Sequence, residues 1–318
     1  MGGGEAPRPL KPGKGLGISM AGKDQPPEDW DMRNLTEKNL TQAVLKRLEK
    51  TSDPRLGQVL SSLVEHLHGF IRDIEPTEAE WETGIRFLTA AGQICDDSRQ
   101  EFILLSDVLG ATILADAINH RKPQGATESS VLGPFYRDGA RQVATAGSIA
   151  ENTPGEPLIV RGRVATTQGQ PIEGALLDIW QSAPNGLYEN QDSHQPEMNL
   201  RGKLLTDGDG RYAFRTVKPE SYPIPNDGPA GKILEAMGGH NRRPAHIHFI
   251  VTAEGYEPVT TQIFVENDPW LDSDPVFGVK DSLVVDFVRH HSPEEAAQLQ
   301  IPNPFYTVDY DFGMVPAG

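Results

Sequence analysis

The chain has 318 residues, of which 37% are hydrophobic and 23% charged, and its formal net charge is −16. This length allows one large domain or two small ones, and either can bury a sizeable core. The acidic balance argues against nucleic acid or an anionic membrane as a partner, because both require a basic face. The single cysteine excludes an internal disulfide framework.

The first 33 residues are rich in Gly, Pro and Lys and show no periodicity, so we expect a flexible N-terminal arm. They also lack the apolar core of a signal peptide. No apolar run along the chain is long enough to predict a membrane-spanning helix. A cytoplasmic setting is therefore expected.

Residues 34–125 show a helical pattern. Apolar residues recur at helical spacing over residues 40–48 and 56–70, which predicts two helices. Thr77 with Glu80 forms a capping box that opens a third helix, and Ser98 with Glu101 forms another. The second box opens one very apolar helix that continues to Leu114. This much apolar surface predicts a deep core, a subunit interface, or both.

From Pro157 the apolar period changes from helical to two. Strands are predicted over residues 158–164, 175–180, 212–217, 244–253, 259–266 and 282–288, with Gly, Pro and Asp turns between them. Ser292 and Pro293 open a short helix near the C-terminus. The expected fold class is mixed α and β, with an N-terminal helical domain (residues 34–125) and an antiparallel β-sandwich catalytic domain (residues 126–318).

A His-x-His pair marks the strand predicted over residues 244–253. Side chains two apart in a strand share a face, and here they stand roughly 6.6 Å apart, so His246 and His248 can converge on one metal ion. His66 and His68 have the same spacing, but they lie in a predicted helix and point to nearly opposite sides. The alternative for His246 and His248 is a pair of core histidines with satisfied hydrogen bonds.

Two tyrosines in unusual loops precede the His-x-His strand. Tyr188 follows the strand that ends at Trp180, and Tyr222 lies in a loop stiffened by prolines. A free phenol has a pKa near ~10, so only a strongly polarising cation would hold it as a phenolate at neutral pH. Two phenolates and two imidazoles suit ferric iron better than zinc or copper(I). A zinc hydrolase that adds a carboxylate to the His pair, and a binding sandwich without catalysis, are the alternatives.

Several motifs in this order resemble the intradiol ring-cleavage dioxygenases. They are Val160-x-Gly162-x-Val164, Gly169, Ile172, Leu177-Asp178-Ile179, Gly186-x-Tyr188, Tyr222-Pro223-x-Pro225, Arg243-Pro244-Ala245-His246-x-His248 and Gln262. The helical region before the sandwich is also similar to the N-terminal helical domain of that family.

The resemblance implies a non-haem Fe(III) centre that cleaves a small aromatic diol or triol with O2. Tyr188, Tyr222, His246 and His248 would be the protein ligands, and Tyr222 would also act as a base. Arg243 would stabilise negative charge on the substrate, and Gln262 would support the site from behind. The family also commonly forms homodimers through its N-terminal helices, with a phospholipid in an apolar tunnel.

Within the family, residues 127–136 and 276–283 look more like hydroxyquinol 1,2-dioxygenases than like catechol 1,2-dioxygenases. In that subgroup a Leu and an Asp on the last helix before the sandwich face the ring, and they correspond to Leu104 and Asp107. Asp107 could accept a hydrogen bond from a third ring hydroxyl, which catechol lacks. The remaining pocket residues would be Val131, Leu132, Gly133, Pro134, Phe135, Ile224, Pro225 and Arg243. Catechol is the alternative substrate.

Overall fold

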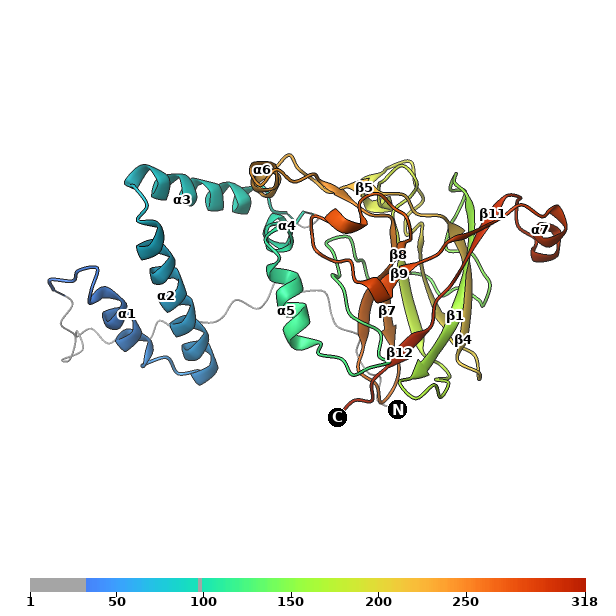
Figure 1. Ribbon diagram of the computed structural model, residues 1–318, viewed down its shortest axis with the longest axis horizontal. Helices are drawn as coiled ribbons and strands as arrows, with labels where there is room; N and C mark the ends of the chain where they lie inside the picture. Colours follow the sequence, from blue (N-terminus) through green and yellow to red (C-terminus); the bar gives the residue numbers. More distant parts are fainter. Residues whose placement is uncertain (1–32, 97–98) are drawn as a thin grey trace. The chain divides into compact units, whose positions relative to one another are not determined.

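The computed structural model describes residues 33–96 and 99–318 (Figure 1). The described residues fall into two compact units that divide between Thr89 and Ala90. Almost all of the predicted arm, and Ser98 of the second predicted capping box, lie outside the described residues. The predicted domain boundary near residue 125 stays a prediction.

The first unit consists of helices. They are α1 (Leu40–Leu48), α2 (Pro54–Ile74) and α3 (Glu78–Gln93), which continues past the boundary. The Thr77–Glu80 capping box is confirmed, because the Thr77 N–H donates to Glu80 Oε2 over 2.8 Å and the Glu80 N–H donates to Thr77 Oγ1 over 3.3 Å. His66 and His68 lie in α2 as predicted, and His68 Nδ1 is 3.0 Å from Thr41 Oγ1.

Apolar side chains on α2 and α3 are exposed. The exposed large apolar residues of these two helices are Val59, Leu63, Leu67, Phe70, Ile74, Trp81, Ile85 and Leu88. An amphipathic helix normally buries such a face, so this surface is suited to a partner.

The prediction of one continuous apolar helix from Glu101 to Leu114 is wrong. The structure has α4 (Glu101–Val108) and α5 (Ala111–Asn119), and Gly110 lies between them with φ of +70°. A left-handed glycine ends a helix at low cost because it has no Cβ, and here it separates α4 from α5.

The second unit contains two five-stranded sheets and a short ribbon. The first sheet is built from β1 (Pro157–Thr166), β4 (Arg211–Val217), β10 (Val288–His290), β11 (Phe305–Asp309) and β12 (Phe312–Met314). The second has the order β3 (Arg201–Leu205), β2 (Leu176–Trp180), β7 (His246–Thr252), β8 (Val259–Val265) and β9 (Val284–Val285). The ribbon pairs β5 (Tyr222–Pro223) with β6 (Arg242–Arg243).

The sandwich is mainly antiparallel, as expected, with parallel pairs at β1–β11, β1–β12 and β8–β9. The strand predicted over residues 282–288 is interrupted, because a 3₁₀ turn covers Asp281–Leu283 and β9 is only two residues long. Strand β3 was not predicted, since its Arg201 and Lys203 break the apolar alternation. The short helix after Ser292 is confirmed as α7 (Pro293–Leu299).

The pleat of β7 separates the core from the site. Ile247, Phe249 and Val251 point between the sheets, where the Phe249 ring centroid is 6.2 Å from that of Phe214 and 5.1 Å from that of Phe312. His246 and His248 therefore point to the opposite face of the second sheet. A second apolar cluster with residues from α4, β2 and the loops covers that face.

Helix α6 (Pro229–Ala236) contacts α4 within this cover. The Glu101 carboxylate in the first turn of α4 accepts a hydrogen bond of 2.9 Å from the Ala230 N–H. In residues 33–96 and 99–318, no helix is both long and apolar enough to cross a membrane.

Gly162 in β1 provides a test of how closely this strand packs against the backbone of Tyr310. A Cβ there would lie 1.8 Å from the Tyr310 carbonyl oxygen, which is a backbone atom and cannot rotate away. We expect Gly162→Ala to lower the free energy of unfolding by about 2 kcal/mol or more, measured by urea denaturation.

Gly208→Ala is the matched control, because a Cβ at Gly208 would have no neighbour within 4 Å. Its free energy of unfolding should stay within about 0.5 kcal/mol of the wild type. Equal stability of the two variants would contradict the close approach of β1 and Tyr310.

Candidate metal centre and adjoining cavity

Four donor atoms from Tyr188, Tyr222, His246 and His248 meet at one point above the second sheet. The Tyr188 Oη is 3.2 Å from the Tyr222 Oη and 3.1 Å from His248 Nε2. The two Nε2 atoms of His246 and His248 are 3.1 Å apart. All four side chains are buried, with at most 4% exposed. The structure thus brings together the four predicted ligands.

Three separate elements deliver these side chains. Strand β7 places His246 and His248 on one face at positions i and i+2. The β5–β6 ribbon pairs Tyr222 with Arg243. Tyr188 precedes a short 3₁₀ helix (Glu189–Gln191), and its N–H donates to the Gln191 side chain over 3.0 Å.

The loop that carries Tyr188 passes very close to the ribbon. Gly186, with φ of +83°, approaches Tyr222 so closely that a Cβ would lie 3.0 Å from the Tyr222 Cβ. A glycine is needed here for both its left-handed backbone and its missing side chain.

Both histidines are neutral in this environment. His246 Nδ1 lies 2.7 Å from the Pro244 carbonyl oxygen, which can only accept, so Nδ1 carries the proton and Nε2 keeps its lone pair. Burial, and then the positive charge of Arg243, lowers the pKa of His246 to about 3. Burial likewise lowers the pKa of His248 and raises the pKa of Tyr188 and Tyr222.

The donor set fits a metal ion. Donor atoms 3.1–3.2 Å apart can share one ion with bonds of about 2 Å. Two oxygens that are anionic when bound and two imidazole nitrogens suit a hard, highly charged ion. Across the described ranges, no three His, Cys, Asp or Glu residues cluster in this way. The carboxylate that a zinc hydrolase would add to the His pair is therefore not found among them.

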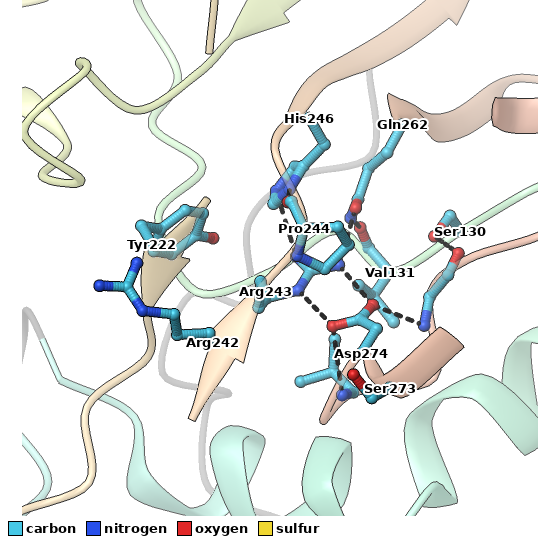
Figure 2. Close-up of polar contacts among 12 residues, drawn as sticks. Ser130, Val131, Tyr222, Arg242, Arg243, Pro244, His246, Gln262, Ser273 and Asp274 are labelled. Carbon is cyan, nitrogen blue, oxygen red and sulfur yellow. Dashed lines mark hydrogen bonds and ion pairs between the residues drawn. The ribbon is translucent and has the colours of Figure 1, made fainter. Parts of the chain in front are cut away.

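Arg243 is held in a fixed orientation beside the donors (Figure 2). Its Nε and Nη2 donate to the two oxygens of Asp274 over 3.0 Å each. Its Nη2 also donates to Gln262 Oε1 over 2.9 Å, and its Nη1 lies 3.2 Å from His246 Nε2. Such a two-point contact with a carboxylate fixes the plane of the guanidinium group.

Gln262 links Arg243 to the cavity wall. Its Nε2 donates to the Val131 carbonyl oxygen over 2.5 Å. The side chain of Gln262 is fully buried and pairs across the sheet with His248. One amide thereby fixes both the arginine and the loop that begins at Val131.

Two residues at this site escaped the sequence analysis. Asp274 belongs to an Asp-Ser-Asp-Pro loop that looks exposed in the sequence, yet it is 6% exposed and holds Arg243. The Trp180 ring stacks on His248, with centroids 4.6 Å apart and planes 9° apart. Only the alternation of β2 hinted at Trp180, and no local signal marks Asp274.

A cavity of about 300 Å³ adjoins the donor cluster. Tyr222 and Arg243 reach into it from the cluster. The other predicted residues that line it are Leu104, Asp107, Val131, Gly133, Pro134, Phe135, Ile224 and Pro225. Leu132 does not line the cavity and is 38% exposed, because it lies between Val131 and Gly133, which face inward.

Six lining residues were not predicted. They are Arg99, Gln100, Glu101, Asn190, Gln191 and Val276. The first three precede or begin α4, and two others follow Tyr188 in the chain. All six depend on how α4 and two loops come together over the sheet, which no local pattern in the sequence specifies.

Asp107 brings a carboxylate into this cavity. It is 3% exposed, and its Oδ1 is buried without a hydrogen-bond partner among the described residues. Burial raises its pKa, while a hydrogen bond from Thr112 and the charge of Arg243 act in the opposite direction. An acceptor with an unused oxygen can bind a hydroxyl group of a ligand.

Comparisons with known proteins agree along nearly the whole chain. The family model described as Dioxygenase matches residues 131–316, and the one described as Catechol dioxygenase N terminus matches residues 53–127. The chain is 48% identical to the hydroxyquinol 1,2-dioxygenase of Rhizobium sp. strain MTP-10005, over 87% of this chain and 94% of that protein. It is 37% identical to the catechol 1,2-dioxygenase of Candida albicans, over 86% and 91%.

A solved structure gives the same result. The hydroxyquinol 1,2-dioxygenase of Pseudomonas putida DLL-E4 superposes with a TM-score of 0.83 at 47% identity, covering 88% of this chain and 99% of that one. Both family models match, and the identity to these relatives extends over most of the chain. The chain therefore belongs to the intradiol ring-cleavage dioxygenases.

Proposed function

We propose that the chain is a hydroxyquinol 1,2-dioxygenase. It would cleave the ring of 1,2,4-trihydroxybenzene between the two adjacent hydroxyl-bearing carbons and add both atoms of O2. The product is 3-hydroxy-cis,cis-muconate, whose keto form is maleylacetate. The observation that carries the choice of substrate is the unpaired Asp107 Oδ1 in the cavity beside the four donors.

Catechol is the less supported alternative. It has no third hydroxyl, so it would leave Asp107 Oδ1 buried and unpaired, which is unfavourable. The greater identity to the Rhizobium enzyme than to the Candida enzyme also supports hydroxyquinol.

We propose non-haem Fe(III) as the cofactor, held by Tyr188, Tyr222, His246 and His248. When bound, the ion would supply a strong Lewis acid that polarises the hydroxyl groups of the substrate. Tyr222 lines the cavity as well as the donor cluster, so its Oη is placed to accept a proton from a substrate hydroxyl. Arg243 provides a permanent positive charge for the anionic substrate, and Asp274 and Gln262 keep that charge in place.

The assembly is also a proposal. The exposed apolar side chains on α2 and α3 support a homodimer formed through the helical domain, residues 34–125. The same apolar surface could hold a phospholipid. A cytoplasmic location stays a prediction from the sequence.

The metal assignment can be tested with Tyr188→Phe. Phenolate bound to Fe(III) absorbs visible light, so the wild-type protein should be coloured and contain stoichiometric iron. Tyr188→Phe should lose most of the absorption near its maximum, bind less iron, and lose at least about 100-fold in the rate of O2 uptake. Absorption spectra, metal analysis and oxygen-electrode measurements provide the readouts.

Tyr212→Phe is the matched control, because Tyr212 is equally buried but donates its hydroxyl to the Tyr310 carbonyl, away from the donor cluster. It should lose some stability and keep its colour. A colourless wild-type protein with stoichiometric zinc would refute the assignment.

The substrate assignment can be tested with Asp107→Ala. Loss of a hydrogen bond to a charged acceptor should lower kcat/KM for hydroxyquinol by about 10–100-fold and leave kcat/KM for catechol much less affected. Because burial raises the pKa of Asp107, the wild-type preference should weaken as the pH falls through that raised pKa. The preference of Asp107→Ala should not change over the same pH range.

Leu104→Ala serves as the control on the same helix and the same cavity wall. It removes apolar contact only, so it should affect both substrates to a similar extent. Equal losses for both substrates in Asp107→Ala would remove Asp107 from the specificity argument.

A further inference from the structure

A row of four buried side chains crosses the second sheet and includes one of the donors, His248. Arg201, Trp180, His248 and Gln262 are successive cross-strand partners on β3, β2, β7 and β8. Directly paired residues in antiparallel strands point to the same face, so all four project toward the donors. Each is at most 2% exposed. Arg201 ends the row and has no role in the function proposed above.

The positive charge of Arg201 is only partly compensated. Its Nε donates to Glu189 Oε2 over 2.6 Å, and neither Nη1 nor Nη2 has a hydrogen-bond partner among the described residues. Arg137 donates to the other oxygen of Glu189 over 2.6 Å, and its Nη2 also lies 3.4 Å from Glu197 Oε1. Two guanidinium groups, both always charged, therefore share the Glu189 carboxylate, while the exposed Glu197 compensates part of the charge of Arg137. The charge of Arg201 is buried, and only its Nε is paired.

Tyr188 lies beside this buried charge. The Arg201 Cζ is 5.9 Å from the centroid of the Tyr188 ring, within the range of a cation–π contact. Phe135 stacks on the same ring, with centroids 4.6 Å apart. Glu189 is the next residue after Tyr188, so the ion pair also anchors the backbone that carries the ring. The attraction grows when the ring becomes electron-rich, as a phenolate ligand is.

We infer that Arg201 is a positioning residue, which holds the Tyr188 ring and stabilises it in its iron-bound, anionic form. The inference rests on the proposed function, because it requires Tyr188 to be a ligand of Fe(III). Glu189 has two opposing effects in this arrangement: it fixes Arg201 in place, and its negative charge offsets part of the field that Arg201 exerts on Tyr188. Removal of the Arg201 charge should therefore raise the energy of the electrons on the Tyr188 phenolate, and removal of the Glu189 charge should lower it.

The test uses the visible absorption of the iron-loaded, full-length protein. In Arg201→Met the electrons of the phenolate rise in energy, so the tyrosine-to-iron band should move to longer wavelength. In Glu189→Gln the field of Arg201 is unopposed, so the band should move to shorter wavelength. Arg201→Lys retains the charge and should bring the band back toward the wild-type position. By competition with a chelator, the iron affinity of Arg201→Met should fall roughly tenfold.

Arg289→Met is the matched control. Arg289 lies 5.7 Å from the ring centroid of Tyr306, a tyrosine outside the donor cluster, so its removal should leave the band unchanged. Thermal melts of each metal-free variant establish folding, and if Arg201→Met does not fold, the direction of the Glu189→Gln shift decides.

A merely structural Arg201 would lower the melting temperature without moving the band. That result, or shifts of both variants in the same direction, would overturn this inference while leaving the iron assignment intact. A wild-type protein without any band would overturn both.

Discussion

Strand β7 carries Ile247, Phe249 and Val251 on one face and His246 and His248 on the other. The first face forms the centre of the sandwich core, and the second faces the donor cluster. Since a shift of one residue would exchange the two faces, the hydrophobic core that fixes the register of β7 also fixes the positions of the proposed metal ligands. The stability of the sandwich and the geometry of the site are therefore coupled through one strand. Substitutions in the core should disturb the site mainly by changing this register or its neighbours β2 and β8.

Burial controls the charge state of the cluster. Arg243 and Asp274 bring two opposite charges into the interior with a two-point contact, so neither is left unpaired. Desolvation, together with the positive charge of Arg243, lowers the pKa of His246, which favours the neutral ring with Nε2 free to bind an ion. The phenols lie in the same dry environment, where burial raises their pKa more than the nearby arginine charges lower it, so their neutral form is favoured until a cation binds. Arg243 thus favours the neutral form of His246, and it also gives the cavity a positive charge that suits an anionic substrate.

The sequence allowed some of these features to be predicted and concealed others, for physical reasons. The His-x-His pair follows from strand periodicity alone, and the capping box of Thr77 and Glu80 follows from local chemistry. Tyr188 and Tyr222 lie far from the histidines in the sequence, so their convergence required the family resemblance. Asp274 and Arg201 could not be recognised, because each acts through a partner that only the loop path or the strand register brings near. The break at Gly110 was visible in the sequence, yet the strong apolar run around it suggested one helix.

The proposed metal ligands and the residues proposed to select the substrate belong to different parts of this unit. The donors come from β7, the ribbon and the loop after β2, whereas Leu104 and Asp107 come from α4. Helix α4 is joined to the site through Glu101 and α6 rather than through the ligands themselves. A substitution on the inner face of α4 can therefore change which ring is accepted without changing how the metal is held. Such a separation would allow proteins of one family to differ in the ring they accept, as the names of the hydroxyquinol and catechol relatives indicate.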